Sequence, residues 1–306
     1  MKFRTAAACI IILSFLTGVG LAVLTTEKDV PVYKESSLYQ KILNEKDKHE
    51  LKAEDAVIDS VWKKTPGIYG REVDVEASYK KMKEDGTYKE EHLVYKMTRP
   101  DVSLEDLPPA PVYRGHPDKK AVSLLINVSW GEAYIPEMVD LLNKHQAKAA
   151  FFIDGAFADE FPHLIQMIEE EGHTIGSHGY GHKDMGRMSK AEAADNLKQA
   201  DDILFALTKQ KIEYFAPPSG SFHMETVEAA DDLGMETILW TVDTIDWQKP
   251  SKDVLVNRVL NKVHNGATVL MHPTQVTVDS LPQLIEGIRK KGLQISDLPK
   301  MLSEER

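Results

Sequence analysis

The sequence has little cysteine and a deficit of positive charge. Cys9 is the only cysteine in 306 residues, which excludes an intramolecular disulfide and a cysteine-rich zinc site. Lysine and arginine number 37 against 48 aspartate and glutamate residues, a net charge of −11. A surface that binds nucleic acid needs clustered positive charge, so we expect no nucleic-acid partner. With 42% apolar and 28% charged residues, the composition is typical of a globular protein.

One long stretch without charge lies near the N-terminus, between Thr5 and Leu24. A stretch of about 20 apolar residues just spans a bilayer. The basic flank at Lys2 and Arg4 predicts that the chain after the span lies outside the cytoplasm. We expect residues 1–29 to form a membrane anchor, with a cleaved signal peptide as the alternative and a buried core helix as a third interpretation. The protein is therefore expected to be extracytoplasmic, and either membrane-anchored or secreted.

The region after this segment predicts a small unit followed by a linker. Residues 30–117 are expected to form a juxtamembrane spacer and a small α+β region, with a helix within 71–86 and a strand over 92–97. Five prolines within 100–117 indicate an extended linker. The second domain is then expected to cover residues 118–306.

Short apolar runs alternate with amphipathic segments in this second domain, which predicts repeated βα units around a parallel sheet. The expected strands are 122–128, 149–153, 173–176, 214–215, 237–240, 268–271 and 294–295. The expected helices are 134–145, 157–170, 189–208, 223–233, 251–263 and 279–291. This α/β pattern fits either an incomplete barrel or a doubly wound sheet, and both place function at the carboxyl ends of the strands.

Polar residues follow three of these strands. His178 and His182 are four residues apart after a strand and can face one metal ion such as zinc, although such pairs also arise by chance. His272 ends another strand, where it is either a general acid or a structural histidine. Asp243 and Asp246 follow a third strand, where they either orient that histidine or cap the next helix.

Residues 120–302, about three fifths of the chain, resemble the polysaccharide deacetylase family (carbohydrate esterase family 4, or chitooligosaccharide deacetylase homology domain). Lys148–Ile153 also looks like the family. Five motifs stand in the family's order: Ile126–Gly131 where a strand usually ends in an Asp pair, Ser177–His182 for His-x-x-x-His, Ala216–Gly220 for Arg-Pro-Pro-Tyr-Gly, Asp243–Trp247 for Asp-x-x-Asp-Trp, and Leu270–His272 for the last motif.

The resemblance implies a distorted seven-stranded (β/α) barrel and a metal-dependent hydrolysis of N-acetyl groups on polysaccharide. His178 and His182 match the family's metal ligands. His272 matches the acid that protonates the departing amine, and Asp246 matches the carboxylate that tunes it. The backbone N–H of Ser219 stands at the position of an oxyanion donor.

Two family residues are replaced. Asn127 stands at the position of the base Asp; in an alternative register, Ser129 and Trp130 stand under the Asp pair, and neither register supplies a carboxylate. Ala216 replaces the Arg that orients the base. An Asn amide cannot accept a proton from water near neutral pH, and general-base catalysis typically contributes roughly 10²- to 10⁴-fold.

The divalent metal site implied by the family, for zinc or a similar ion, is therefore incomplete. Glu132 or Asp154 is a candidate oxygen ligand or substitute base, although both fit loop or solvent roles better. Two functions follow as hypotheses: a deacetylase of N-acetylated cell-envelope glycans such as peptidoglycan with weak or lost activity, or an inactive saccharide-binding or scaffold pseudoenzyme. Either one would use a groove lined by Trp247, Leu270 and Trp130.

Overall fold

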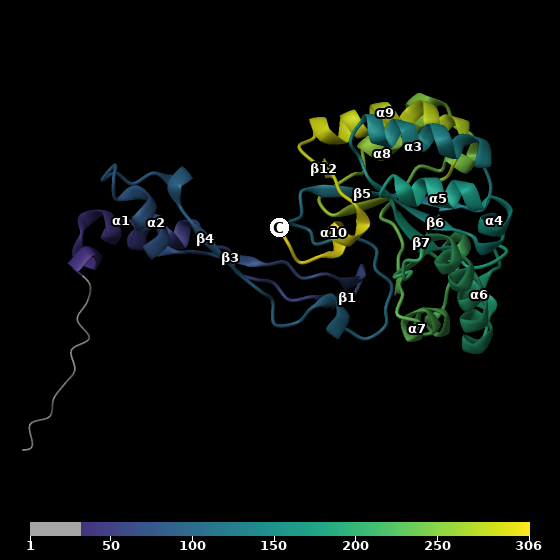
Figure 1. The fold of residues 1–306 in the computed structure, drawn as a ribbon, viewed down its shortest axis with the longest axis horizontal. Coiled ribbons are helices and arrows are strands. Elements are labelled where there is room, and N and C mark those ends of the chain that lie inside the picture. The colour runs from purple at the N-terminus through teal and green to yellow at the C-terminus, as the bar shows by residue number, and fades with distance from the viewer. Residues whose placement is uncertain (1–31) are drawn as a thin grey trace, which may run out of the picture.

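The computed structural model describes residues 32–306, which form a small body and a large body joined by an extended region (Figure 1). The predicted membrane segment lies outside these residues. Among the helices of residues 32–306, none is both long enough and apolar enough to cross a bilayer.

The small body consists of two helices beside an antiparallel strand pair, in agreement with the expected α+β character. Asp74 caps the second helix by accepting a hydrogen bond from the Ala77 N–H at 3.0 Å. Apolar side chains from both helices and from the strand pair form its core, including Ile42 and Met82. The elements are α1 (Ser37–Glu45), α2 (Val75–Met82), β3 (Gly70–Val73) and β4 (Tyr95–Thr98).

The extended region holds a hairpin of β1 (Val57–Asp59) and β2 (Lys63–Thr65). Its Lys64 side chain is 1% exposed and forms an ion pair of 2.5 Å with Glu236 of the large body. The N–H of Tyr69 donates to the Glu304 carbonyl at 2.7 Å, close to the C-terminus. These contacts attach the extended region to the large body.

The large body is built on a parallel sheet of eight strands, and this confirms the α/β prediction. Seven strands follow one another in the order β10-β11-β5-β6-β7-β8-β9, and β12 pairs with the start of β5. Among the described strands, β10 and β9 do not pair with each other. The curled sheet therefore does not close into a full barrel and forms a half-barrel. The strands are β5 (Ala121–Val128), β6 (Ala149–Ile153), β7 (Thr174–Ser177), β8 (Tyr214–Phe215), β9 (Glu236–Thr237), β10 (Val242–Asp243), β11 (Ala267–Met271) and β12 (Gln294–Ile295).

Helices surround the outer side of this sheet (Figure 1). The single helix expected over 157–170 is wrong: it divides at Phe161, because Pro162 lacks the N–H that a continuous helix needs and disfavours helical backbone in the residue before it. The outer helices are α3 (Ile135–Lys144), α4 (Gly155–Glu160), α5 (Pro162–Glu170), α6 (Lys190–Thr208), α7 (Met224–Asp232), α8 (Lys252–Leu260) and α9 (Gln275–Lys290). Helix α10 (Leu298–Leu302) packs instead in a separate cluster with Leu125 and Phe152.

Strand β5 lies within the sheet and is buried on both faces. Leu124 and Ile126 belong to the apolar cluster that includes the surrounding helices, whereas Leu125 belongs to a second cluster with Phe152 of β6. Successive side chains of a strand alternate between faces. Asn127 therefore shares the inner face with Leu125, near the carboxyl end of the strand.

Candidate functional site

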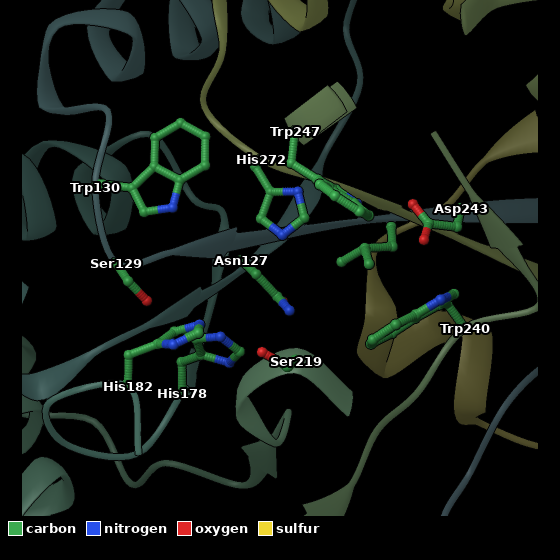
Figure 2. A pocket seen from close by; sticks show the side chains of 11 residues that line it. Asn127, Ser129, Trp130, His178, His182, Ser219, Trp240, Asp243, Trp247 and His272 are labelled. Carbon is green, nitrogen blue, oxygen red and sulfur yellow. The ribbon is translucent and has the colours of Figure 1, made fainter. Parts of the chain in front are cut away.

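A cavity of about 460 Å³ opens at the carboxyl ends of the strands (Figure 2). The side chains that line it come from β5, β10 and β11 and from the loops after β5, β7, β8, β9, β10 and β11. Among the predicted site residues, Asp246 and Ala216 are buried and do not line it, and the candidates Glu132 and Asp154 do not line it either. The lining residues are Asn127, Ser129, Trp130, His178, His182, Ser219, Trp240, Asp243, Trp247, Leu270 and His272.

His178 and His182 lie together at one side of the cavity, with ring centroids 5.4 Å apart. The Nδ1 atom of His178 is 2.7 Å from the carbonyl oxygen of Ala216. A carbonyl can only accept, so Nδ1 carries the hydrogen and Nε2 is left with a free lone pair. Burial, reinforced by His182, lowers the pKa of His178 to about 3 and keeps the ring neutral.

Asp154 holds the loop that carries this pair. Its carboxylate accepts hydrogen bonds from the N–H groups of Ala156, Gly181 and His182 at 2.8, 3.1 and 2.6 Å. His182 adopts a left-handed backbone with φ of 48°, and the bond to Asp154 satisfies its N–H there. Asp154 therefore caps α4 and fixes the loop, which is the structural role that the sequence favoured.

Asp246 and His272 form a buried carboxylate–imidazole pair. Asp246 is fully buried, and its Oδ1 lies 2.8 Å from Nδ1 of His272. Its Oδ2 accepts from the His272 N–H at 2.6 Å and from the Thr277 hydroxyl at 2.7 Å. The His272 ring lies nearly parallel to Trp130, with centroids 6.0 Å apart. This pairing leaves Nε2 of His272 as the ring nitrogen available to the cavity.

The two replaced positions lie on the inner side of the sheet. Asn127 is 4% exposed, and its Oδ1 has no hydrogen-bond partner among residues 32–306. Figure 2 shows its side chain directed into the cavity between His272 and Ser219. Ala216 is buried in the apolar cluster of Leu125 and Phe152. The structure therefore has an uncharged amide at position 127 and a methyl group at position 216 on this side of the sheet.

These residues do not complete the family's metal site. Within residues 32–306, no three or more His, Cys, Asp or Glu side chains are grouped so that they could hold a metal ion. Glu132 is exposed and lines a neighbouring cavity of about 400 Å³, and Asp154 is occupied by backbone N–H groups. The two imidazoles are thus without a carboxylate ligand, and we derive no chemical step through a metal.

Two lining residues were not predicted as site residues. Trp240 was assigned to a strand over 237–240, but β9 ends at Thr237 and the indole lines the cavity. Asp243 was expected either to orient His272 or to cap the next helix, and the structure places it in the lining of the cavity. The signal available in the sequence was their position in the same short segment as Asp246 and Trp247.

The curled half-barrel matches the fold of solved carbohydrate esterase family 4 structures. The family model for polysaccharide deacetylases matches residues 114–238. The chain belongs to this family, and its large body is polysaccharide deacetylase-like.

Particular relatives extend the match beyond the family domain. The chain is 44% identical over 269 residues to the uncharacterized protein YlxY of Bacillus subtilis, covering 88% of this chain and 84% of that protein. It is 30% identical over 201 residues to a peptidoglycan-N-acetylglucosamine deacetylase of Bacillus cereus, covering 63% and 73%. A crystal structure described as a carbohydrate esterase family 4 pseudoenzyme from Bacillus anthracis has a TM-score of 0.83 at 44% identity, covering 89% and 97%. A mutant of that pseudoenzyme is described as having restored enzymatic activity, with the same TM-score and identity over 89% and 100% of the chains.

Proposed function

We propose that the protein binds an amino-sugar glycan of the cell envelope in the 460 Å³ cavity and has lost the ability to hydrolyse its N-acetyl groups. The observation that carries this proposal is the amide of Asn127 at the position where the family pattern has its base. The amide is buried on the inner face and directed into the cavity, at a position where a base would need a carboxylate.

Proton transfer is the step of hydrolysis that Asn127 cannot support. Hydrolysis of an amide needs a group that takes a proton from the attacking water, and a carboxamide cannot do so near neutral pH. The loss of such a base costs roughly 10²- to 10⁴-fold in rate. The missing metal carboxylate and the Ala216 replacement remove further parts of the same machinery. The pseudoenzyme from Bacillus anthracis, which aligns with 89% of this chain, supports the same conclusion by likeness.

Two exposed indoles in the cavity favour the binding of glycan. Trp247 is 55% exposed and Trp130 is 45% exposed, and both line the cavity. Tryptophan combines a large apolar face with a polar N–H and is enriched at binding interfaces. Their flat faces suit the apolar faces of sugar rings.

A weakly active hydrolase is the second candidate, because one observation favours it. The pair of Asp246 and His272 is intact at 2.8 Å, and it is the arrangement that a general acid requires. If the protein only binds glycan, the same pair would serve to orient the His272 ring at the edge of the cavity.

For its location, we infer that the protein works outside the cytoplasm and is held at the membrane or released from it. The basic flank before the uncharged stretch from Thr5 to Leu24 supports this. The relatives that are named as peptidoglycan deacetylases support the cell envelope as the compartment.

The experiment combines binding and turnover on the full-length protein. N-acetylglucosamine tetramer and peptidoglycan fragments are titrated into it, bound divalent metal is measured, and acetate release is followed. We expect binding without acetate release from the native chain, and measurable release from the Asn127→Asp, Ala216→Arg double variant. Metal-dependent turnover by the native chain that His272→Ala abolishes would support the hydrolase instead.

A further inference from the structure

The cavity has two sides of different chemistry. His178 and His182 lie on one side, while Trp240, Trp247 and Asp243 lie on the other (Figure 2). Leu270 also lines the cavity. The deacetylase chemistry of the family accounts for the imidazole side, but it gives no role to Trp240 or to the carboxylate of Asp243 beside the indole of Trp247.

Asp243 is a partly buried carboxylate that forms no salt bridge within residues 32–306, and Arg258 acts on it only at longer range. Its Oδ1 accepts from the Ile245 N–H at 2.8 Å, and none of the hydrogen bonds found among residues 32–306 uses its Oδ2. No lysine or arginine is among the lining residues of the cavity. Burial, with a smaller contribution from nearby Asp246, raises the pKa of the Asp243 carboxyl, and the opposing effects of the Ile245 N–H, His272 and Arg258 do not offset it. The charge on this side of the cavity is therefore incompletely compensated by the protein.

A small cation suits this environment better than a neutral group. A primary ammonium donates charge-assisted hydrogen bonds to a carboxylate, and it is attracted to the face of an indole, which is the strongest aromatic partner for cations. An acetamido group has no charge to offer, and its carbonyl oxygen is repelled by the carboxylate.

We propose that Asp243, Trp240 and Trp247 form a subsite for the ammonium group of a deacetylated hexosamine, so that the cavity prefers glycan from which N-acetyl groups have already been removed. This inference rests on the proposed function and names its ligand class. It places the protein after a deacetylation reaction, as a receptor for the product.

The test compares tetramers of glucosamine and N-acetylglucosamine by calorimetric titration at pH 6, where an aliphatic amine is protonated. The native protein is expected to bind the glucosamine tetramer at least tenfold more tightly, and Asp243→Asn to remove at least tenfold of that affinity, as expected for loss of a hydrogen bond between charged groups. The variant should bind the N-acetylated tetramer at least as tightly as the native protein does, because the charge that repels the acetamido oxygen is gone. Asn retains the oxygen that accepts from Ile245, and binding of the N-acetylated tetramer also shows that the variant is folded.

Asp279→Asn is the matched control, because Asp279 is an exposed carboxylate that lines the adjacent cavity without lining this one. An equal loss in this control would assign the preference to overall charge and overturn the subsite.

A lysine-containing peptide is a further ligand, since cell-wall peptides also carry ammonium groups. Equally tight, Asp243-dependent binding of the peptide would overturn the hexosamine assignment. Binding of both tetramers with equal affinity would overturn this inference alone, whereas binding of neither would also remove the proposed function.

Discussion

If Asn127 and Ala216 replace a charged pair of the family, then restoring both charges should be less destabilising than restoring each one alone. The free energies of unfolding of the single and double variants test this coupling. Ala216 is 2% exposed and packs in the cluster with Leu125 and Phe152. An arginine at this position would carry its guanidinium into an apolar region toward Asn127, which cannot neutralise it. A buried charge without a partner costs about 3 to 5 kcal/mol. We therefore expect Ala216→Arg alone to reduce the free energy of unfolding by about that amount.

Asn127→Asp alone should also destabilise the protein, by about 1 to 3 kcal/mol, because Asn127 is 4% exposed and its Oδ1 already has no hydrogen-bond partner in the described chain. In the double variant the two charges compensate each other. We expect the double variant to be more stable than the sum of the two losses predicts, by roughly 2 to 3 kcal/mol.

The assay is urea unfolding of the native protein, the two single variants and the double variant, followed by far-UV circular dichroism. Ala216→Met is the matched control, since it adds a long side chain without charge and measures the cost of overpacking. Its cost should not be relieved by Asn127→Asp. Losses that add to within about 0.5 kcal/mol in the arginine pair would refute the coupling between these positions.

Three further predictions concern buried polar groups. Asp246→Ala should cost about 3 kcal/mol in urea unfolding, because it leaves the Thr277 hydroxyl and two His272 donors without their acceptor. Glu236→Gln should cost about 3 to 5 kcal/mol, because the buried Lys64 ammonium loses its partner, and adding Lys64→Met should recover most of this loss in thermal unfolding. Burial, with a contribution from the charge on a nearby lysine, lowers the pKa of His173 to about 4. The unfolded chain therefore takes up a proton below about pH 6.5 that the folded chain refuses down to about pH 4, so His173→Gln should reduce the loss of stability on acidification across that range by about 3 kcal/mol.

Each of these predictions has a contrary outcome. An Asp246→Ala protein that unfolds at the native urea concentration would show that its hydrogen bonds contribute nothing net. A Lys64→Met, Glu236→Gln protein no more stable than Glu236→Gln would place the cost elsewhere than in the unpaired ammonium. Parallel stability curves for the native protein and His173→Gln between pH 4 and 6.5 would exclude His173 as the group that is protonated on unfolding.

Much of the large body could be predicted from its sequence, because its elements are strongly patterned. The buried run of β5 and the capped helix α6 appear within one or two residues of their expected bounds. Shorter elements were harder to predict from the sequence. Strand β10 has two residues and depends on pairing with β11, and the start of α9 is set by the hydrogen bond from the Thr277 N–H to the Thr274 hydroxyl rather than by apolar periodicity.

The site could be predicted as a list of residues but not as an arrangement. Spacing indicated that His178 and His182 lie together, and motif order placed Asp246 with His272. The commitment of Asp154 to the backbone of a distant loop was not accessible, because it depends on tertiary contacts between β6 and the loop after β7. The difference between the two sides of the cavity was hidden for the same reason, since it depends on where the chain places Trp240 and Asp243 after β9.

The central claim is that the cavity binds glycan and no longer hydrolyses it. Its most direct test is acetate release from N-acetylglucosamine tetramer by the full-length native protein, with zinc supplied and with saturation of the cavity verified by titration. The account predicts a saturated protein that releases no acetate above the protein-free control. Acetate release that saturates with the same tetramer concentration as binding, and that His272→Ala abolishes, would contradict it.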